Sequence, residues 1–203
     1  MSALVTRGFV GRSRTRNPGL PPGQYDARSD WPVLSAEVTP DLPTEDWTFR
    51  IDGLVSEART WTWEEVRELP GSTWEGDIHC VTTWSKFGVR FGGVSLDVFL
   101  DAVRPDPSAT HAVAYAHTGY TTNLPLADLR GGRAWLALTA QDAPLTPEHG
   151  GPARLLVPHL YFWKSAKWLA GIRLLDHDEP GFWERNGYHA RGNPWEEQRY
   201  AGD

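Results

Sequence analysis

The chain has 203 residues, 40% of them hydrophobic and 23% charged, which is the size and composition of one compact globular domain. Its net charge of −6 argues against a general nucleic-acid-binding protein, and no apolar run approaches the about 18 residues that a membrane-spanning helix needs. One cysteine excludes an internal disulfide, whereas 20 glycines, 16 prolines and 11 tryptophans predict many turns and few long helices.

Residues 1–30 are predicted to form an irregular N-terminal arm, followed by a single domain over residues 31–203. The arm lacks the apolar stretch of a secretory signal and has no twin-arginine pair, so we expect a cytoplasmic protein. Four of its arginines, at positions 7, 12, 14 and 16, fit either a solvated tail or a strap over an anionic group, since a guanidinium presents a planar pair of donors to phosphate.

The first predicted elements are a strand and a capped helix. Hydrophobic residues alternate with polar ones from Trp47, which indicates a half-buried strand that Gly53 ends. Thr62 can cap a short helix over residues 63–69, because a threonine hydroxyl accepts from the free N–H groups of a first turn, and Pro70 ends it.

The remaining elements are short apolar segments separated by turns. We expect strands from residue 74 into a loop at 79–84, and at 112–116, 120–122, 134–139, 155–157 and 167–175, with a helix at 95–103 and one helical turn at 126–129. The run at 155–157 is expected to pair in the centre of a sheet. Strands and short helices interleave without a strict βαβ rhythm, so the predicted fold class is α+β.

Cys80 is the first candidate for chemistry. A lone cysteine is ordinarily a small buried hydrophobe, but this one follows His79 in a polar run, and the nearby Lys86 favours the thiolate. A single thiolate cannot hold zinc, and no finger-type spacing of two cysteines exists. Cys80 therefore either attacks a substrate or binds a metal whose other ligands come from a cofactor.

A second candidate site combines His149, Gly150–Gly151 and Arg154 with Ser165 and Lys167. Two glycines ahead of a strand allow the backbone to approach an anion, which the two cations would neutralise while the serine adds a hydroxyl. The alternative is an ordinary glycine turn before a buried strand, with a solvated lysine pair beyond it.

His117 follows a buried strand, a position where ligands often bind in mixed sheets, although an isolated histidine is more often a structural residue. Together these candidates describe one soft ligand, several anion-binding groups and large apolar walls. That combination suits a bulky phosphorylated heteroaromatic cofactor carrying a metal.

The segments Cys80–Lys86 and His149–Pro158, with the continuation Tyr161–Lys167, resemble the sulfite oxidase family of molybdenum enzymes. The similarity is to the family's short bacterial branch and covers the chain from about Trp47 to Tyr200. It implies a molybdopterin-binding fold of mixed β-sheets with short helices.

The resemblance also implies roles for particular residues. In this family the dithiolene of one molybdopterin supplies two sulfurs to molybdenum and a protein cysteine supplies a third, which here is Cys80. Lys86 would draw an anionic or oxide-bearing substrate toward the metal, and Asp30–Trp31 matches the family's N-terminal cofactor contacts by position only. Cofactor contacts are implied at His117, His149, Arg154, Ser165, Ala166 and Lys167.

The implied activity is an oxidoreductase that moves an oxygen atom to or from a small substrate. Ser85 stands where animal sulfite oxidases place an anion-binding arginine, which puts sulfite in doubt as the substrate. No haem, flavin or iron–sulfur motif is visible, so we expect a separate electron-transfer partner. A chain of 203 residues leaves no room for the family's dimerisation domain, and we therefore expect a monomer.

Two other functions fit the residues alone. A non-enzymatic module could bind carbohydrate or peptide on its exposed indoles. A cysteine-nucleophile enzyme could use Cys80 with His79, His117 or His149 as the base.

Overall fold

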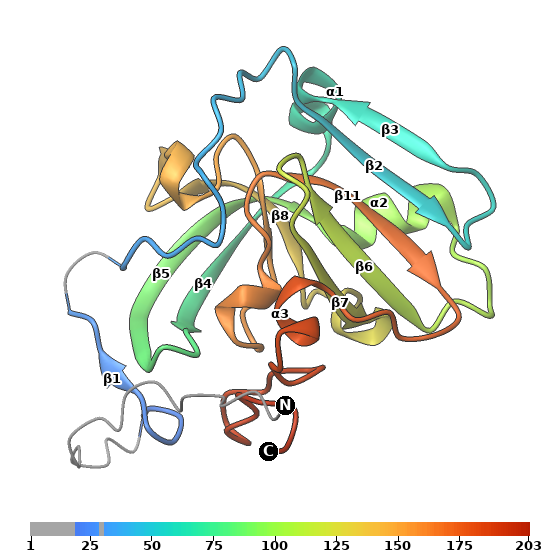
Figure 1. Ribbon diagram of the computed structural model, residues 1–203. Coiled ribbons are helices and arrows are strands. Elements are labelled where there is room, and N and C mark those ends of the chain that lie inside the picture. The colour runs from blue at the N-terminus through green and yellow to red at the C-terminus, as the bar shows by residue number, and fades with distance from the viewer. Residues whose placement is uncertain (1–18, 29–30) are drawn as a thin grey trace.

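A computed structural model describes residues 19–28 and 31–203 (Figure 1). Within these residues the strands form two sheets. The first has the order β1-β5-β8-β10, with β4 also paired to β5 and β9 to β8. Its strands are β1 (Tyr25–Asp26), β4 (Gly71–His79), β5 (Trp84–Ser95), β8 (Trp135–Ala140), β9 (Ala143–Pro144) and β10 (Arg154–Leu156).

The second sheet has the order β3-β2-β11-β6-β7, and its central pair β2·β11 is parallel. Its strands are β2 (Thr48–Gly53), β3 (Arg59–Thr62), β6 (His111–Ala116), β7 (Thr121–Pro125) and β11 (Leu169–Leu175). The helices are α1 (Trp63–Glu68), α2 (Leu96–Val103) and α3 (Phe182–Arg185), with short 3₁₀ turns η1 (Leu126–Asp128), η2 (Pro147–His149) and η3 (Phe162–Lys164). In the described residues no helix is long and apolar enough to cross a membrane.

Local sequence signals explain several of these elements. In β2, Phe49 and Ile51 are fully buried while Thr48 and Arg50 are exposed, as the alternation predicts. At the start of α1 the Thr62 hydroxyl accepts from the Glu65 N–H at 3.3 Å, and the Glu65 carboxylate accepts from the Thr62 N–H at 2.8 Å. This reciprocal capping box confirms the predicted helix start.

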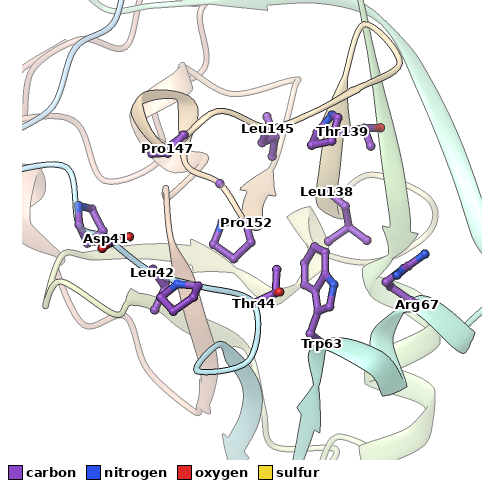
Figure 2. Close-up of a pocket in the computed structure, with 14 residues that line it drawn as sticks. Asp41, Leu42, Thr44, Trp63, Arg67, Leu138, Thr139, Leu145, Pro147 and Pro152 are labelled. Atoms are coloured by element: carbon purple, nitrogen blue, oxygen red, sulfur yellow. The ribbon is translucent and has the colours of Figure 1, made fainter.

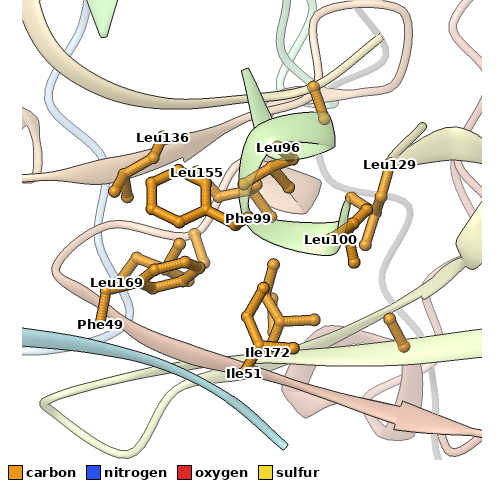
Figure 3. Close-up of a cluster of buried hydrophobic side chains, with 14 of the residues drawn as sticks. Phe49, Ile51, Leu96, Phe99, Leu100, Leu129, Leu136, Leu155, Leu169 and Ile172 are labelled. Carbon is orange, nitrogen blue, oxygen red and sulfur yellow. The ribbon is translucent and has the colours of Figure 1, made fainter. Parts of the chain in front are cut away.

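The main core lies between the two sheets and includes the buried face of α2 (Figure 3). Leu96, Phe99, Leu100 and Val103 of α2 are buried at the spacing of one helix face, and the polar residues between them face outward. Figure 3 shows Phe99 and Leu100 directed toward Phe49, Ile51 and Ile172 of the second sheet, with Leu136 and Leu155 of the first sheet beside them.

A smaller cluster occupies the opposite face of the first sheet. Consecutive residues alternate between the two clusters, so Leu155 packs in the main core and Leu156 in the smaller one. The smaller cluster consists of Ile78, Cys80, Trp84, Val89, Phe91, Ala137, Leu145 and Leu156. Cys80 therefore lies on the face that the main core does not use.

The structure corrects two predictions. Residues 19–28, assigned to the irregular arm, belong to the domain, because Tyr25–Asp26 pair in parallel with Trp84–Ser85 and Gln24 is buried. The run at residues 155–157 was expected in the centre of a sheet, but β10 ends the path of the first sheet and is buried by packing rather than by a second paired strand. The four arginines of the arm lie outside the described residues.

Candidate functional site

A cavity of about 280 Å³ brings the two sequence blocks together. Cys80, just after β4, faces it together with His149 at the end of η2, Arg154 at the start of β10 and the segment Ser165–Lys167. The two parts of the second block, residues 149–158 and 161–167, lie side by side, because the backbone N–H of Leu155 donates to the Ala166 carbonyl at 2.8 Å. Two segments that are far apart in the chain thus form one site.

A tight turn presents the thiol of Cys80. The Cys80 N–H donates to the Trp84 carbonyl at 2.8 Å, and the Thr83 N–H donates to the Cys80 carbonyl at 3.0 Å. Thr83 adopts a φ of 80°, in the left-handed region that such a turn requires. Cys80 is 8% exposed, and its Sγ lies 3.2 Å from the Thr82 hydroxyl.

Burial raises the pKa of the Cys80 thiol, because a thiolate loses its hydration in the interior. The Thr82 hydroxyl, the backbone N–H groups of Thr82 and Val81, and the charge of Arg199 act in the opposite direction and lower that pKa. The cation that acts on the sulfur is therefore Arg199, which the sequence analysis did not identify.

Lys86 does not reach the cavity. Its Nζ donates to the Arg28 carbonyl at 3.0 Å, and it is not among the residues that line the cavity. Although Lys86 pairs across the sheet with Ile78, two residues before Cys80, its ammonium is held at the Arg28 carbonyl and not at the cavity. The prediction that Lys86 attracts the substrate is not supported by its position.

Side chains from both ends of the chain hold the thiol-bearing turn. Gln24 Nε2 donates to the Cys80 carbonyl at 3.0 Å, and Arg199 Nη1 donates to the Val81 carbonyl at 2.6 Å. Arg199 Nη2 also donates to the Pro22 carbonyl at 3.0 Å. Figure 1 shows the C-terminal segment beside the segment around β1. The turn is thus fixed by contacts with long sequence separation.

A chain of hydrogen bonds extends from Gln24 to His79. The Ser85 hydroxyl, which is fully buried, donates to Gln24 Oε1 at 3.2 Å, so it accepts from His79 Nδ1 at 2.7 Å. Burial lowers the pKa of His79 to about 4, and the ring is neutral at pH 7. His79 and Ser85 therefore support the backbone of Cys80, and neither residue lines the cavity.

Arg154 is the most unusual charge at the site. It is 1% exposed, and its guanidinium donates to the carbonyls of His149 and Ser165, both at 2.7 Å. The Phe162 ring covers the guanidinium carbon at 4.2 Å. Burial lowers the pKa of Arg154 to about 9, and no carboxylate forms an ion pair with it among residues 19–28 and 31–203. A buried cation of this kind favours an anionic ligand.

Lys167 and Ser165 add further donors. Lys167 Nζ donates to the Glu148 carbonyl at 2.6 Å, and burial, with the charge of Arg154, lowers its pKa to about 8. The Ser165 hydroxyl accepts from the Val157 N–H at 2.9 Å and keeps its own hydrogen. The site can thus present two positive charges and a hydroxyl to one ligand.

The glycines have a different role from the one predicted. A Cβ on Gly150, whose φ is 101°, would lie 3.0 Å from Lys167 Cα, and one on Gly151 would lie 2.2 Å from the Leu145 carbonyl. Close packing of the turn against Lys167 and Leu145 therefore requires both glycines. In the structure they serve this packing and bring His149 beside Lys167.

His149 is placed at the site and His117 is not. The His149 ring stacks on Trp31, with centroids 4.2 Å apart and planes at 13°. His117 is exposed, and its Nε2 donates to the Thr48 carbonyl at 3.0 Å on β2. The turn after β6 directs His117 away from the cavity, which is instead lined by Tyr120, three residues further on.

Aromatic side chains form most of the remaining wall of the cavity. The Tyr120 hydroxyl donates to the Trp163 carbonyl at 2.8 Å, and this hydrogen bond fixes the position of the Tyr120 ring. The Trp84 indole N–H is buried and has no acceptor in the described residues, although its ring faces the cavity. The aromatic residues of the wall are Trp31, Trp84, Tyr120, Phe162, Trp163, Trp168, Trp183 and Tyr188.

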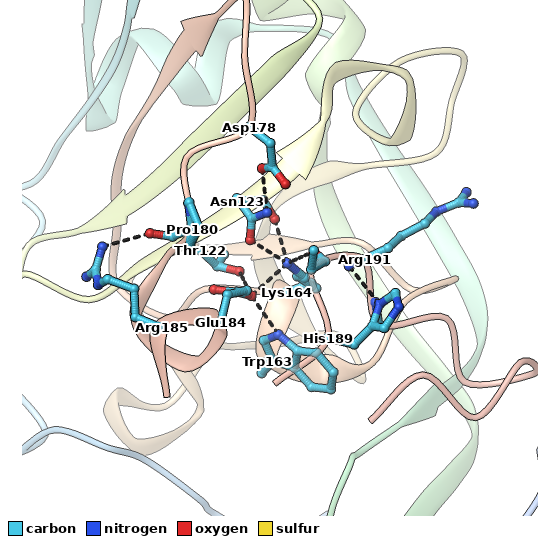
Figure 4. Close-up of polar contacts among 12 residues, drawn as sticks. Thr122, Asn123, Trp163, Lys164, Asp178, Pro180, Glu184, Arg185, His189 and Arg191 are labelled. Atoms are coloured by element: carbon cyan, nitrogen blue, oxygen red, sulfur yellow. Dashed lines mark hydrogen bonds and ion pairs between the residues drawn. The ribbon is translucent and has the colours of Figure 1, made fainter. Parts of the chain in front are cut away.

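A buried ion pair anchors this wall from behind (Figure 4). Lys164 is fully buried and donates through Nζ to Glu184 Oε1 at 2.7 Å, to the Asn123 side chain at 2.9 Å and to the Ala190 carbonyl at 2.6 Å. Glu184 Oε1 also accepts from Trp163 Nε1 at 2.9 Å. Lys164 thus joins the segment before Ser165 to the C-terminal residues; it is not half of a solvated lysine pair.

A second pocket, of about 610 Å³, lies on the other side of the glycine turn (Figure 2). Its walls include Leu42, Trp63, Leu138 and Pro152, and its charged lining residues are Asp41 and Arg67. Cys80, Arg154 and Lys167 do not line it. The candidate chemistry therefore belongs to the smaller cavity.

Residues 36–183 match the family of the oxidoreductase molybdopterin binding domain. The chain belongs to this family. This molybdopterin-binding oxidoreductase is 41% identical over 201 residues to the uncharacterized oxidoreductase YuiH of Bacillus subtilis, and the match covers 96% of the chain and 100% of that protein. It is 30% identical to the protein-methionine-sulfoxide reductase catalytic subunit MsrP of Gluconobacter oxydans over 80% of the chain, but that match covers only 58% of the relative.

The fold of the oxidoreductase is similar to that of a solved relative. The sulfane dehydrogenase SoxCD of Paracoccus pantotrophus aligns with a TM-score of 0.64 and 22% identity over 69% of the chain and 41% of the SoxCD chain. These comparisons confirm the predicted sulfite oxidase family and its α+β fold. They also confirm an enzyme, and not a carbohydrate- or peptide-binding module.

Proposed function

We propose that the cavity binds molybdopterin, that Cys80 is the protein ligand of its molybdenum, and that the enzyme transfers an oxygen atom to or from a small substrate. One observation carries the proposal. The lone thiol of the described residues lines the same cavity as Arg154, a buried cation with no ion-paired carboxylate among those residues.

The lining residues fit this cofactor chemically. Arg154 and Lys167 match the charge of a phosphate, because buried cations near each other are stabilised by a bound anion. The unpartnered indole N–H of Trp84 needs an acceptor, which a pterin provides at its ring oxygen and nitrogens. The flat aromatic walls match a planar ring system.

Each residue then has a defined task. When bound, the molybdenum cofactor supplies two-electron transfer of an oxygen atom. Cys80 presents its thiolate from a turn that Gln24 and Arg199 hold in place. Arg154 and Lys167 neutralise the anionic end of the ligand, and His149 is oriented by its stacking on Trp31. The aromatic wall limits the access of water to the thiol.

The charges near Cys80 support a neutral substrate. Ser85, at the position where an arginine would bind an oxyanion, is buried in a hydrogen-bond chain, and Lys86 lies elsewhere. The cations that line the cavity within the described residues are Arg154 and Lys167, both assigned to the cofactor. We therefore propose a small neutral oxide, such as a sulfoxide, which agrees with the name of the MsrP relative.

Metal and pterin analysis of the purified protein tests the function. We expect one molybdenum and one pterin per chain, measured by elemental analysis and by pterin fluorescence after acid oxidation. With a reduced dye as electron donor, the enzyme should reduce a small sulfoxide faster than it oxidises sulfite. A purified protein without molybdenum and pterin would contradict the proposal. The separate electron-transfer partner, the monomeric state and the cytoplasmic location stay predictions.

Cofactor binding should depend on the protonation of Lys167. Its pKa of about 8 means that the empty site loses this charge as the pH rises through 8, whereas a bound anion favours the charged form. We expect the affinity of the metal-free protein for molybdopterin to fall above pH 8 by up to about tenfold per pH unit. The Lys167→Met variant should bind molybdopterin more weakly and should not show this fall in affinity above pH 8.

Fluorescence titrations on both sides of pH 8 measure this effect. The Lys86→Met variant is the matched control, because it removes an exposed ammonium that does not line the cavity. The same pH dependence in Lys167→Met as in the wild type would refute the role of Lys167.

A further inference from the structure

Thr82 and Cys80 form a hydrogen bond, and the chemistry of the site determines which of the two side chains is the donor. Thr82 Oγ1 lies 3.2 Å from Cys80 Sγ, and both residues line the cavity. A thiol can donate to or accept from the hydroxyl. A thiolate has no hydrogen, so toward a metal-binding sulfur the Thr82 hydroxyl must be the donor.

The backbone holds this contact in place. Both carbonyls at the start of the turn have side-chain donors, Gln24 at Cys80 and Arg199 at Val81. The Cys80 N–H and the Thr83 N–H close the turn on itself. Since the residues on each side of Thr82 are fixed, its hydroxyl stays within hydrogen-bonding distance of the sulfur.

We propose that Thr82 is a positioning residue whose hydroxyl donates a hydrogen bond to the Cys80 sulfur and thereby sets how strongly this sulfur donates electrons to the metal. The inference rests on the proposed role of Cys80 as the ligand. A hydrogen bond withdraws electron density from a thiolate, so the metal is less stabilised in its oxidised state and its reduction potential rises.

Four variants of the purified holoenzyme test the inference. Thr82→Val and Thr82→Ala remove the hydroxyl with different side-chain volumes, and Thr82→Ser restores it. Thr83→Val makes the same chemical change one residue further on, at a side chain that does not line the cavity. Redox titration followed by electron paramagnetic resonance of Mo(V) gives the midpoint potential, and absorption spectroscopy gives the sulfur-to-molybdenum charge-transfer band.

We expect both Thr82→Val and Thr82→Ala to have a lower midpoint potential than the wild type and a sulfur-to-molybdenum charge-transfer band at longer wavelength. Thr82→Ser and Thr83→Val should resemble the wild type. The inference is overturned if a hydroxyl-free variant that retains molybdenum has the potential and band of the wild type, or if Thr83→Val shifts equally. A wild-type protein without molybdenum would instead overturn the proposed function on which the inference rests, so the two failures are distinguishable.

Discussion

Replacing Cys80 with serine should lower turnover by more than about 100-fold, because even residues behind a metal ligand typically contribute 10- to 100-fold to metal affinity or activity. A serine hydroxyl is a much weaker ligand for a soft site, since it stays protonated at neutral pH. The pterin, with the molybdenum that its dithiolene holds, should be largely retained, because Arg154 and Lys167 are unchanged and lie in another segment of the cavity.

Molybdenum, pterin and turnover of Cys80→Ser are measured on the same preparation, together with its thermal unfolding. Thr83→Val controls for a change in the turn that leaves the thiol intact. Wild-type turnover in a folded Cys80→Ser protein that contains molybdenum would rule out the ligand role. A parallel loss of molybdenum and pterin would show instead that Cys80 is needed to retain the cofactor.

Lys164→Met should lower the free energy of unfolding by about 3–5 kcal/mol, the cost of leaving one partner of a buried ion pair alone. Lys164 is fully buried, and its removal leaves the carboxylate of Glu184, whose side chain is 3% exposed, without its cation. The carbonyls of Asn123 and Ala190 lose their donor as well. Figure 4 shows Glu184 and Asn123 directed at the ammonium of Lys164.

Urea unfolding of the metal-free protein measures this loss. The matched control is Lys86→Met, a partly exposed lysine whose removal should cost less than about 1 kcal/mol. The double variant Lys164→Met, Glu184→Gln should be more stable than Lys164→Met alone, since no charge is then left unpaired. Equal losses for Lys164→Met and Lys86→Met would show that the buried pair does not stabilise the fold.

Sequence reasoning succeeded where a signal is local. The Thr62 cap, the alternation of β2 and the amphipathic spacing of α2 depend on residues within a few positions of one another, and the structure has all three elements. The same holds for the two sequence blocks that carry the family resemblance, because each block is contiguous. Membership in the family follows from them and is confirmed by the comparisons.

The errors at the site have a common physical cause. Lys86 is close to Cys80 in the chain, yet its ammonium is held at the Arg28 carbonyl, and His117 follows a suitable strand but points toward β2. Arg199, in contrast, is 119 residues from Cys80 and lies close enough to lower its pKa. Short separation in the sequence is therefore a poor guide to which charges act on the thiol.

By itself, the amino-acid sequence determined the fold class, the enzyme family and the two segments that meet at the cavity, because hydrophobic period, capping and contiguous motifs are encoded locally. Only the tertiary structure decided which side chains face the cavity, that residues 19–28 belong to the first sheet, and that Lys164 is buried in an ion pair. The physical reason is that strand pairing, burial and the pairing of distant charges depend on contacts that form only when the two sheets and both ends of the chain come together.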